Sequence, residues 1–413
     1  MDWSMKTFHE LYLEILKQEA KTGRNLVENY NPYHMDCLLH PEKHAPVIHT
    51  ESCEKCAYER AYAASCIFDA IEESDGDIKI NPEKCVGCGV CVDACRLKKL
   101  EESKDVLPVL KAVREEGKDV YALVAPAFIG QFGENVTPGR IRTALKAVGF
   151  KGMIEVAVFA DILTLKEALE FDRHVLTEQD FQLTSCCCPV WIAMIRNIYS
   201  ELVPHVPGAV SPMVAAGRVV KQIYPEAVTV FIGPCMAKKK EAKEPDIADA
   251  VDYVLTFQEM QDIFDAAEIH PGELTEEAME HSSRAGRIYA RTGGVSEAVK
   301  KTVEQLSPHR EIMVHAEQAD GVPACRALID KIKSGETTAN FFEGMACKGG
   351  CVGGPKAVIP KEEGKEQVNL YGDAAIYRTP LESPYVMELL ARLGFGSVED
   401  LIEKSDLLTR NFG

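Results

Sequence analysis

Residues 184–191 read TSCCCPVW, residues 234–241 read PCMAKKKE and residues 345–354 read MACKGGCVGG. These three separated strings hold six of the 15 cysteines of the chain. Thiolate-rich sites select iron–sulfur clusters, zinc or copper(I) rather than hard cations. Cysteines so distant in sequence share one site only where the fold gathers them. We therefore expect a metal site that is built into the core of the protein.

Apolar strands alternate with amphipathic helices after residue 105, and this alternation predicts the fold that gathers the cysteines. Such a pattern indicates an α/β domain with parallel sheets flanked by helices. We predict strands at 120–124, 154–159, 182–184, 228–232, 253–256 and 311–315, and helices at 138–148 and 163–175. Cys186, Cys235 and Cys347 each follow a predicted strand or apolar run, and open α/β sheets bind ligands at the carboxyl ends of their strands.

The chain divides into two predicted domains, residues 1–102 and 103–413. The first starts with a helix and continues through an Asn-, Pro- and His-rich stretch at 23–49, which we expect to be an irregular loop. It ends in a small α+β ferredoxin-like region with two 4Fe-4S clusters. The second is the α/β domain that carries the three strings, and we predict helices at 384–393 and 398–407 near its end.

The spacing Cys85-x2-Cys88-x2-Cys91-x3-Cys95 is that of bacterial ferredoxins, except that arginine replaces the proline after the last cysteine. In this run three thiolates hold one 4Fe-4S cubane and the fourth ligates the neighbouring cluster, whereas zinc is the less favoured alternative. Cys66, which is followed by Ile-Phe-Asp-Ala-Ile, resembles the last cysteine of a second half-motif. We therefore assign Cys66 to the cubane of Cys85, Cys88 and Cys91.

The other N-terminal cluster lacks one obvious ligand. Cys53, Cys56 and Cys95 supply three thiolates, and Cys37 is the predicted fourth, provided that the preceding stretch folds back over the cluster. The alternatives are His34, His40, His44 or His49 as the fourth ligand, or an incomplete 3Fe cluster.

Composition and charge exclude several classes of protein. The 413 residues are 46% hydrophobic and 27% charged, which is typical of a soluble globular protein. A formal charge of −18 argues against a nucleic-acid partner. The apolar runs are too short to span a bilayer, the N-terminus shows no signal segment, and cysteines in such a chain favour metal chemistry over disulfides. We expect a cytoplasmic protein without membrane insertion.

The three strings resemble the signatures of iron-only (FeFe) hydrogenases, which are usually written TSCCPxW, PCxxKxxE and MACxGGCxxGG. They occur here in the same order, and the likeness extends over about residues 120–355. The resemblance implies an H-cluster, in which a 4Fe-4S cubane is bridged to a two-iron subcluster with carbon monoxide, cyanide and a dithiolate. Its implied ligands are Cys188, Cys235, Cys347 and Cys351, of which Cys351 also bridges to the two-iron unit.

The resemblance also implies roles for residues around this cofactor. Lys238 would donate to a cyanide, although a solvated surface lysine is the plain alternative. Further implied cofactor-binding residues are Ser211, Ala125, Pro126, Gly293, Gly294 and Met345. The glycine pair would look the same if it only turned the chain into a helix.

Heterolytic cleavage of H2 requires a base near the metal and a proton relay to solvent. Cys187 is the first candidate for the relay because a thiol can pass protons. Glu167 and Glu170 share one face of a predicted helix and match the two relay glutamates of the family. Their alternative reading is an ordinary charged helix face, and Cys186 is an additional thiol that could replace Cys187.

Several positions depart from the common form of the family. Pro207 stands near the place of a relay serine, Gly233 replaces a methionine, and Met213 replaces a glutamine. Groups around a metal site set its potential and access, so these changes affect tuning more than ligation. The set resembles the divergent, group D-like branch that is regarded as sensory.

We therefore expect an FeFe hydrogenase that interconverts H2 with protons and electrons. Electrons would pass through the two N-terminal clusters to ferredoxin or another redox partner, and maturation proteins would supply the two-iron unit. Slow turnover would suit a hydrogen sensor with a separate signalling partner. The alternative is a non-catalytic hydrogenase-like iron–sulfur protein in cluster assembly, although such relatives usually lack the relay cysteine and a residue like Lys238.

Overall fold

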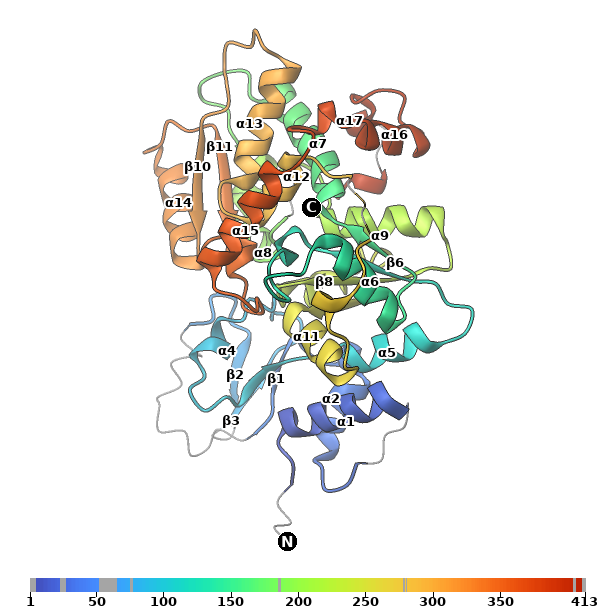
Figure 1. Ribbon diagram of the computed structural model, residues 1–413. Helices are drawn as coiled ribbons and strands as arrows, with labels where there is room; N and C mark the ends of the chain where they lie inside the picture. The colour runs from blue at the N-terminus through green and yellow to red at the C-terminus, as the bar shows by residue number, and fades with distance from the viewer. Residues whose placement is uncertain are drawn as a thin grey trace.

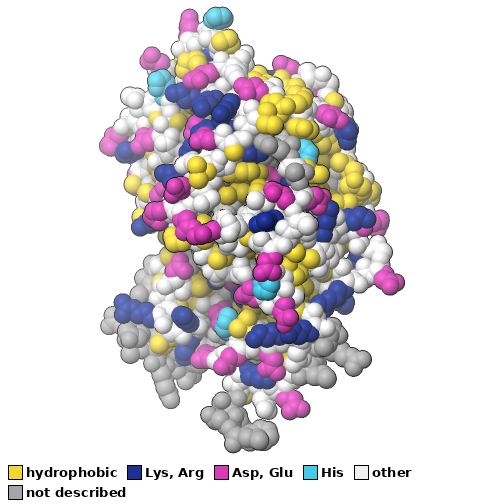
Figure 2. All heavy atoms as spheres, in the orientation of Figure 1, with side chains coloured by type: hydrophobic (Ala, Val, Ile, Leu, Met, Phe, Trp, Pro, Cys, Tyr) yellow, Lys and Arg dark blue, Asp and Glu magenta, His cyan; other side chains and the backbone are white. Residues whose placement is uncertain are grey.

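The computed structural model describes residues 5–22, 27–51, 65–74, 77–184, 187–277, 279, 281–403 and 406–410. Two parallel sheets with their helices form the upper and middle parts of the molecule in Figure 1, and the N-terminal elements lie below them. Figure 2 shows acidic and basic side chains interspersed over the face in view. No helix among the described residues is both long enough and apolar enough to cross a bilayer.

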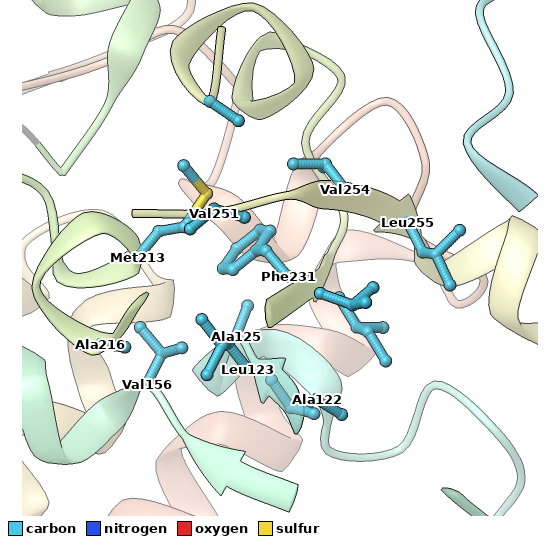
Figure 3. Close-up of a cluster of buried hydrophobic side chains, with 14 of the residues drawn as sticks. Ala122, Leu123, Ala125, Val156, Met213, Ala216, Phe231, Val251, Val254 and Leu255 are labelled. Carbon is cyan, nitrogen blue, oxygen red and sulfur yellow. The ribbon is translucent and has the colours of Figure 1, made fainter. Parts of the chain in front are cut away.

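The middle sheet has four parallel strands in the order β6-β5-β8-β9. Their bounds are β5 (Val120–Val124), β6 (Gly152–Glu155), β8 (Val228–Gly233) and β9 (Tyr253–Thr256). The central strand β8 is buried along nearly its whole length, as expected for a parallel sheet covered on both faces. Figure 3 shows part of the core around Phe231, where side chains of β5, β8 and β9 lie near Met213 and Ala216 of α9 (Pro212–Ile223).

The upper sheet has three parallel strands in the order β10-β11-β7. Their bounds are β7 (Gln182–Leu183), β10 (Ala316–Asp320) and β11 (Phe341–Met345). Every residue of β11 is buried, and Gly344 leaves room for the ring of Trp191, because a Cβ there would lie 2.1 Å from the indole. The sheet order therefore brings β7 and β11, which precede two of the cysteine strings, side by side.

Helices cover these sheets and begin at residues suited to helix starts. Thr137 caps α6 with its side chain, and Thr256 forms a capping box with Glu259 at the start of α11. The long helix α7 is buried at most of its positions because α9, α12 and α13 all pack against it. The helices are α6 (Pro138–Val148), α7 (Ala157–His174), α8 (Pro189–Asn197), α9 (Pro212–Ile223), α10 (Ala237–Glu241), α11 (Phe257–Ala266), α12 (Arg284–Arg287), α13 (Gly294–Leu306), α14 (Val322–Ser334), α15 (Lys361–Asp373), α16 (Pro384–Arg392) and α17 (Asp400–Glu403).

The N-terminal part combines helices with two small antiparallel pairs. Helix α1 (Phe8–Thr22) packs against α2 (Pro32–Leu39), α5 (Val106–Arg114) and α11. Strand β1 (Val47–His49) pairs with β4 (Leu100–Glu102), and β2 (Ile71–Ser74) pairs with β3 (Asp77–Ile80). The short helix α4 (Val90–Ala94) lies within the cysteine run.

Most predicted elements are present, but several predictions were wrong in detail. The helix expected at 398–407 is only α17 (Asp400–Glu403), with a 3-10 turn at Asp406–Leu408. The strand expected at 154–159 ends at Glu155, since α7 starts at Ala157 and its apolar residues are buried on all sides. The strand expected at 311–315 lies at Ala316–Asp320, where pairing with β11 selects the register. The stretch 23–49 contains helix α2, whose first residue is a proline and whose start is capped by Asn31.

Candidate metal centre

Four cysteines from the three strings line a single cavity inside the molecule. They are Cys188, Cys235, Cys347 and Cys351. Among the described residues, no three His, Cys, Asp or Glu side chains converge on one point at the distance of a single bound ion. The four thiols instead surround a space lined almost entirely by apolar atoms.

The ends of parallel strands position these cysteines. Cys188 follows β7 and immediately precedes α8, Cys235 follows β8, and Cys347 follows β11. The sulfur of Cys188 accepts a hydrogen bond from the backbone N–H of Ala346 at 3.5 Å, which ties the first string to the third. Two sheets thus aim their carboxyl ends at one cavity, as open α/β folds do at ligand sites.

Glycine allows the backbone to turn closely between two of the cysteines. Gly350 has φ +88°, and a Cβ there would lie 2.6 Å from the backbone nitrogen of Thr292. Gly354 is equally confined, because a Cβ would lie 2.8 Å from Pro234. The loop that carries Cys347 and Cys351 is therefore packed directly against backbone on both sides.

The pKa values of three of these four thiols, Cys235, Cys347 and Cys351, are raised, which favours their protonated form in the absence of a metal. Burial first, and the charges of neighbouring cysteines second, raise the pKa of Cys235 to about 11 and that of Cys351 to about 12. The same causes raise the pKa of Cys347 well above its ordinary value. Iron–sulfur clusters are bound by thiolates, and metal binding releases these protons. Four cysteines that line one apolar cavity fit a 4Fe-4S cubane.

Lys238 is a buried cation beside the cysteines. It lines the same cavity, and its Nζ is 2.6 Å from Glu241 Oε2. Burial lowers the pKa of the lysine, but the charges of Glu241 and of nearby Cys235 outweigh that effect and raise it. Lys238 therefore stays an ammonium that can donate hydrogen bonds into the cavity.

Cys187 also lines the cavity, and it lies close enough to Glu167 for the charge of the glutamate to affect the thiol. Burial and the charges of Cys188 and Glu167 raise the pKa of Cys187 well above its ordinary value. Glu167 is buried on α7, whereas Glu170 lies one turn further along with its side chain 12% exposed. Pro207 is buried and has no hydroxyl or N–H to offer.

The structure divides the remaining predicted cofactor residues into two groups. Ala125, Pro126 and Met345 line the cavity. Ser211 is buried and caps α9, with its Oγ accepting from Val214 N at 3.4 Å, while the next residue, Pro212, reaches the cavity. Gly293 caps α13 with φ +77°, and Gly294 packs against the Ile288 carbonyl, so the pair shapes the loop behind the cavity.

Sequence reasoning missed two polar side chains near the site. Tyr289 lines the cavity, and its hydroxyl lies 2.8 Å from Thr164 Oγ1. Glu343 is fully buried on β11 and accepts from the N–H groups of Gly293 at 2.7 Å and Ser296 at 2.8 Å. Burial raises the pKa of Glu343. An acidic residue inside an otherwise apolar strand is the sequence signal that could have identified it.

The cysteines predicted to hold the first N-terminal cluster also lie near one another. Cys85 and Cys95 are buried in one apolar cluster against which Cys66 and Cys91 pack. Burial raises the pKa of Cys88 to about 11 and that of Cys91 to about 12, and the charge of Cys66 contributes to both shifts. Cys66, distant in sequence from the run, therefore lies among its members.

The described residues give only part of the second N-terminal cluster. Cys53 and Cys56 lie outside them. Cys95 is buried, and its sulfur accepts from Lys99 N at 3.3 Å. Cys37 lies on α2 within the main core, beside Tyr33 and Asp36, and burial raises its pKa to about 11.

The four histidines considered for this cluster all have partners. His34 Nε2 is 2.8 Å from the Thr50 carbonyl, and His44 Nε2 is 2.9 Å from Asp36. His40 Nδ1 lies 3.3 Å from Glu42 Oε1, and His49 Nε2 lies 3.7 Å from Asp77 Oδ1.

The N-terminal cysteine run packs directly against the second string. A Cβ on Gly87 would lie 3.1 Å from Ala237 Cα, and one on Gly89 would lie 3.3 Å from Met236 Sδ. Both glycines have positive φ, so the loop around Cys88 turns tightly at this contact. The two cysteine sites are thus neighbours.

Comparison with known proteins agrees with this arrangement. Residues 118–355, more than half of the chain, match the family described as iron only hydrogenase large subunit, C-terminal domain. The chain belongs to the iron-only hydrogenase family. Residues 78–96 of this family member match a 4Fe-4S binding domain as well. The expected fold class is confirmed: a hydrogenase-like domain with parallel sheets flanked by helices, and a ferredoxin-like region towards the N-terminus.

Relatives of this hydrogenase-family chain include both enzymes and assembly proteins. It is 29% identical to iron hydrogenase 1 of Clostridium pasteurianum, over 82% of this chain and 76% of that protein. It is 26% identical to cytosolic iron-sulfur assembly component 3 of Bos taurus, over 76% of this chain and 80% of that protein. A solved variant of FeFe-hydrogenase HydA1 from Chlamydomonas reinhardtii has the same fold, with a TM-score of 0.61 and 21% identity over 75% of this chain and 98% of that one.

Proposed function

We propose that this chain is an FeFe hydrogenase that interconverts H2 with protons and electrons at an H-cluster. The observation that carries this proposal is one cavity that contains four cysteines together with Cys187 and Lys238. The four cysteine ligands alone would suit a purely structural iron–sulfur cluster as well as a catalytic one. A buried thiol that is not needed as a ligand and a buried ammonium are additional groups that hydrogen chemistry uses.

The residues have distinct roles in this proposal. Bound in the cavity, the H-cluster supplies the metal and the base that cleave H2 heterolytically. Cys188, Cys235, Cys347 and Cys351 would hold its cubane through their thiolates, and Cys351 would also serve as a ligand of the two-iron unit. Lys238, fixed by Glu241, donates to a cyanide, while Ala125, Pro126 and Met345 exclude water from the apolar wall. Ser211, Gly293 and Gly294 complete this set of cofactor-binding residues by shaping the loops that face the cofactor.

Protons travel along α7 in this proposal. Cys187 would hold a proton at its Sγ on the wall of the cavity and pass it to Glu167, whose charge acts on this thiol. Glu170, one turn further along the same helix and partly exposed, carries the proton towards the surface. Because Pro207 lacks the hydroxyl of the relay serine of the family, the relay at that position is either broken or bridged by water.

Electrons travel through the N-terminal part. We assign residues 1–102 to a two-cluster domain, with one cubane on Cys66, Cys85, Cys88 and Cys91 and a second on Cys37, Cys53, Cys56 and Cys95. Gly87 and Gly89 pack against Met236 and Ala237 of the second string. This contact supports direct electron transfer from the N-terminal clusters into the domain of residues 103–413. Ferredoxin or another redox partner would exchange electrons with these N-terminal clusters. The protein acts in the cytoplasm and depends on maturation proteins for its two-iron unit.

A slow enzyme that senses hydrogen for a separate signalling partner is a narrower form of this proposal. Three departures from the family support it. Met213 lines the cavity, and Gly233 immediately precedes the lining residue Pro234. Pro207 lacks the hydroxyl of the relay serine. Low turnover in both directions with full cofactor content is the expected result for a sensor.

Cluster assembly is the second candidate function, and the similarity to the Bos taurus assembly protein favours it. Infrared spectroscopy of the matured chain separates the two. An enzyme or sensor shows bands of iron-bound carbon monoxide and cyanide, whereas an assembly protein shows none. Absence of these bands in a sample that was matured alongside an active reference hydrogenase would overturn the proposal.

A further inference from the structure

Three successive lysines of the second string contact three different parts of the protein. Lys238 binds Glu241 beside the central cavity, and Lys239 is buried in an ion pair of its own. Lys240 donates from its Nζ to the carbonyl oxygen of Pro82 at 3.0 Å, across the boundary between the two proposed domains. Of the three ammonium groups, that of Lys240 is therefore the one that reaches the N-terminal cysteine run.

The contact with Pro82 places this ammonium group beside a predicted cluster ligand. Pro82 lies three residues before Cys85, in a turn that is closed by a hydrogen bond from the backbone N–H of Cys85 to the Asn81 carbonyl at 3.0 Å. Lys240 and Val86, the residue after Cys85, line the same cavity. The second string thus carries a cation to the first N-terminal cluster site.

The charge of Lys240 is not balanced by an acidic partner. Among the residues that the structure describes, no carboxylate lies within ion-pair distance of its Nζ, including that of Glu83 in the same cavity. The other two cations that line this cavity, Arg196 and Arg410, both bind Glu244. Lys240 is only half-buried, but its bond to a backbone carbonyl leaves its full positive charge in place.

This charge acts on the cluster site. Burial raises the pKa of Cys85, and the charge of Lys240 is among the effects that oppose this rise. Reduction of a 4Fe-4S cluster adds one electron, so the site gains one negative charge. A cation nearby stabilises the reduced form, because the charge around a cluster is one of the factors that set its potential.

We propose that Lys240 raises the reduction potential of the first N-terminal cluster and thereby favours H2 oxidation over H2 production. Oxidation of H2 releases two protons and two electrons, and the electrons leave the central site one at a time through this cluster to ferredoxin or another acceptor. A higher potential makes the cluster a better acceptor. The effect on the potential requires only the cluster, whereas the effect on direction rests on the proposed hydrogenase function.

A purely structural role is the competing explanation, because the bond to Pro82 also joins the two proposed domains. The two roles differ in how they depend on charge. Loss of a structural contact lowers the stability of every variant at this position. Tuning of the potential follows the sign of the side chain at position 240, and it weakens at high salt because a half-buried charge is partly screened.

The test measures the potential of the first cluster in the full chain reconstituted with its 4Fe-4S clusters, by electron paramagnetic resonance during reduction with dithionite. The signal is assigned by its change in Cys88→Ala. We expect Lys240→Gln to shift the reduction equilibrium about tenfold towards the oxidised form, since a unit charge about 10 Å away at an effective dielectric constant of about 20 has roughly this effect. For one electron this is a fall of about 59 mV. Lys240→Arg keeps the wild-type potential, and Lys240→Glu about doubles the shift.

Lys300→Gln is the matched control. It changes the net charge equally, but Lys300 is exposed on α13, at the opposite end of the molecule from α4 and β2 (Figure 1). An unchanged potential in Lys240→Gln, or equal shifts in Lys240→Gln and Lys240→Arg, overturns the proposal.

Turnover of the matured protein tests the effect on direction separately. We expect Lys240→Gln to lower the ratio of H2 oxidation to H2 production severalfold, and an unchanged ratio would overturn this part of the proposal. If Lys240→Gln shifts the potential as expected but the matured wild type has no turnover and no carbon monoxide or cyanide bands, the tuning of the cluster stands and the proposed function fails.

Discussion

Cys88 of the N-terminal run lies close enough to Cys347 in the third string for its charge to raise the pKa of Cys347. Burial contributes most to the raised pKa of Cys347, the cysteines of its own cavity come next, and Cys88 follows them. Since electrostatic coupling through a protein interior weakens with distance, this contribution marks two sites that are adjacent. Packing of Gly87 on Ala237 is the structural reason.

Loss of one proposed cubane ligand should empty the central site and spare the N-terminal ones. We expect Cys347→Ala to bind about four fewer irons per chain than the wild type, since one cubane is lost. Iron analysis of reconstituted protein measures this. Cys325→Ala is the matched control, because Cys325 is a buried thiol that bonds to the Met345 carbonyl at 3.3 Å outside the proposed ligand set. Equal iron content in both variants would contradict the ligand assignment.

Removal of the proposed relay thiol should leave the cofactor and slow the chemistry. We expect Cys187→Ala to keep the infrared bands of the H-cluster while H2 oxidation falls by about 10²–10⁴-fold, the usual contribution of a positioned acid–base group. Hydrogen uptake in an assay with an artificial electron acceptor gives the rate. Undiminished activity would move the relay to another group, and loss of the bands would make Cys187 a structural residue.

Gly350 should tolerate a side chain far less well than Gly335, another glycine with positive φ. Gly350 and Gly335 both have positive φ, but a Cβ at Gly335 meets nothing within 4 Å. Gly335→Ala should cost about 1–2 kcal/mol for the left-handed backbone alone. Gly350→Ala should cost more, because Gly350 has ψ −157°, which lies outside the left-handed helical region, and because the clash with Thr292 adds about 1–3 kcal/mol. Thermal unfolding compares the two variants, and similar melting temperatures would contradict the close packing of this loop.

Glu297 should stabilise the loop behind the cavity in a pH-dependent way. Burial alone would raise its pKa, but Arg291 and Arg284, each 2.5 Å away, lower the pKa to about 2. A lowered acid pKa gives stability that is present above the unfolded value of 4.5 and is lost as the pH falls towards 2.

Glu297→Gln should therefore lower the melting temperature of the cluster-free chain at pH 7, with a difference that shrinks below pH 4.5. Glu304→Gln, on the exposed side of α13, is the control. A difference from the wild type that stays constant across this pH range would mean that the arginines contribute no such stability.

Sequence patterns predicted the elements whose signals are local. The apolar runs at Val120–Val124 and Tyr253–Thr256 and the helix at Pro138–Val148 have the expected bounds. Periodicity failed at Ala157, because a helix buried on all sides has no polar face to distinguish it from a strand. It also failed at Ala316–Asp320, where pairing with β11 rather than composition determines the strand.

The sequence by itself determined which residues can bind metal, since thiol chemistry and motif spacing are properties of the chain. It could not determine which of them meet. Only the tertiary structure brings the ends of β7, β8 and β11 to one cavity, places Tyr289 in its lining, and pairs Glu343 with the backbone of Gly293. These relationships depend on strand order and helix packing between distant segments, which no local pattern of residues encodes.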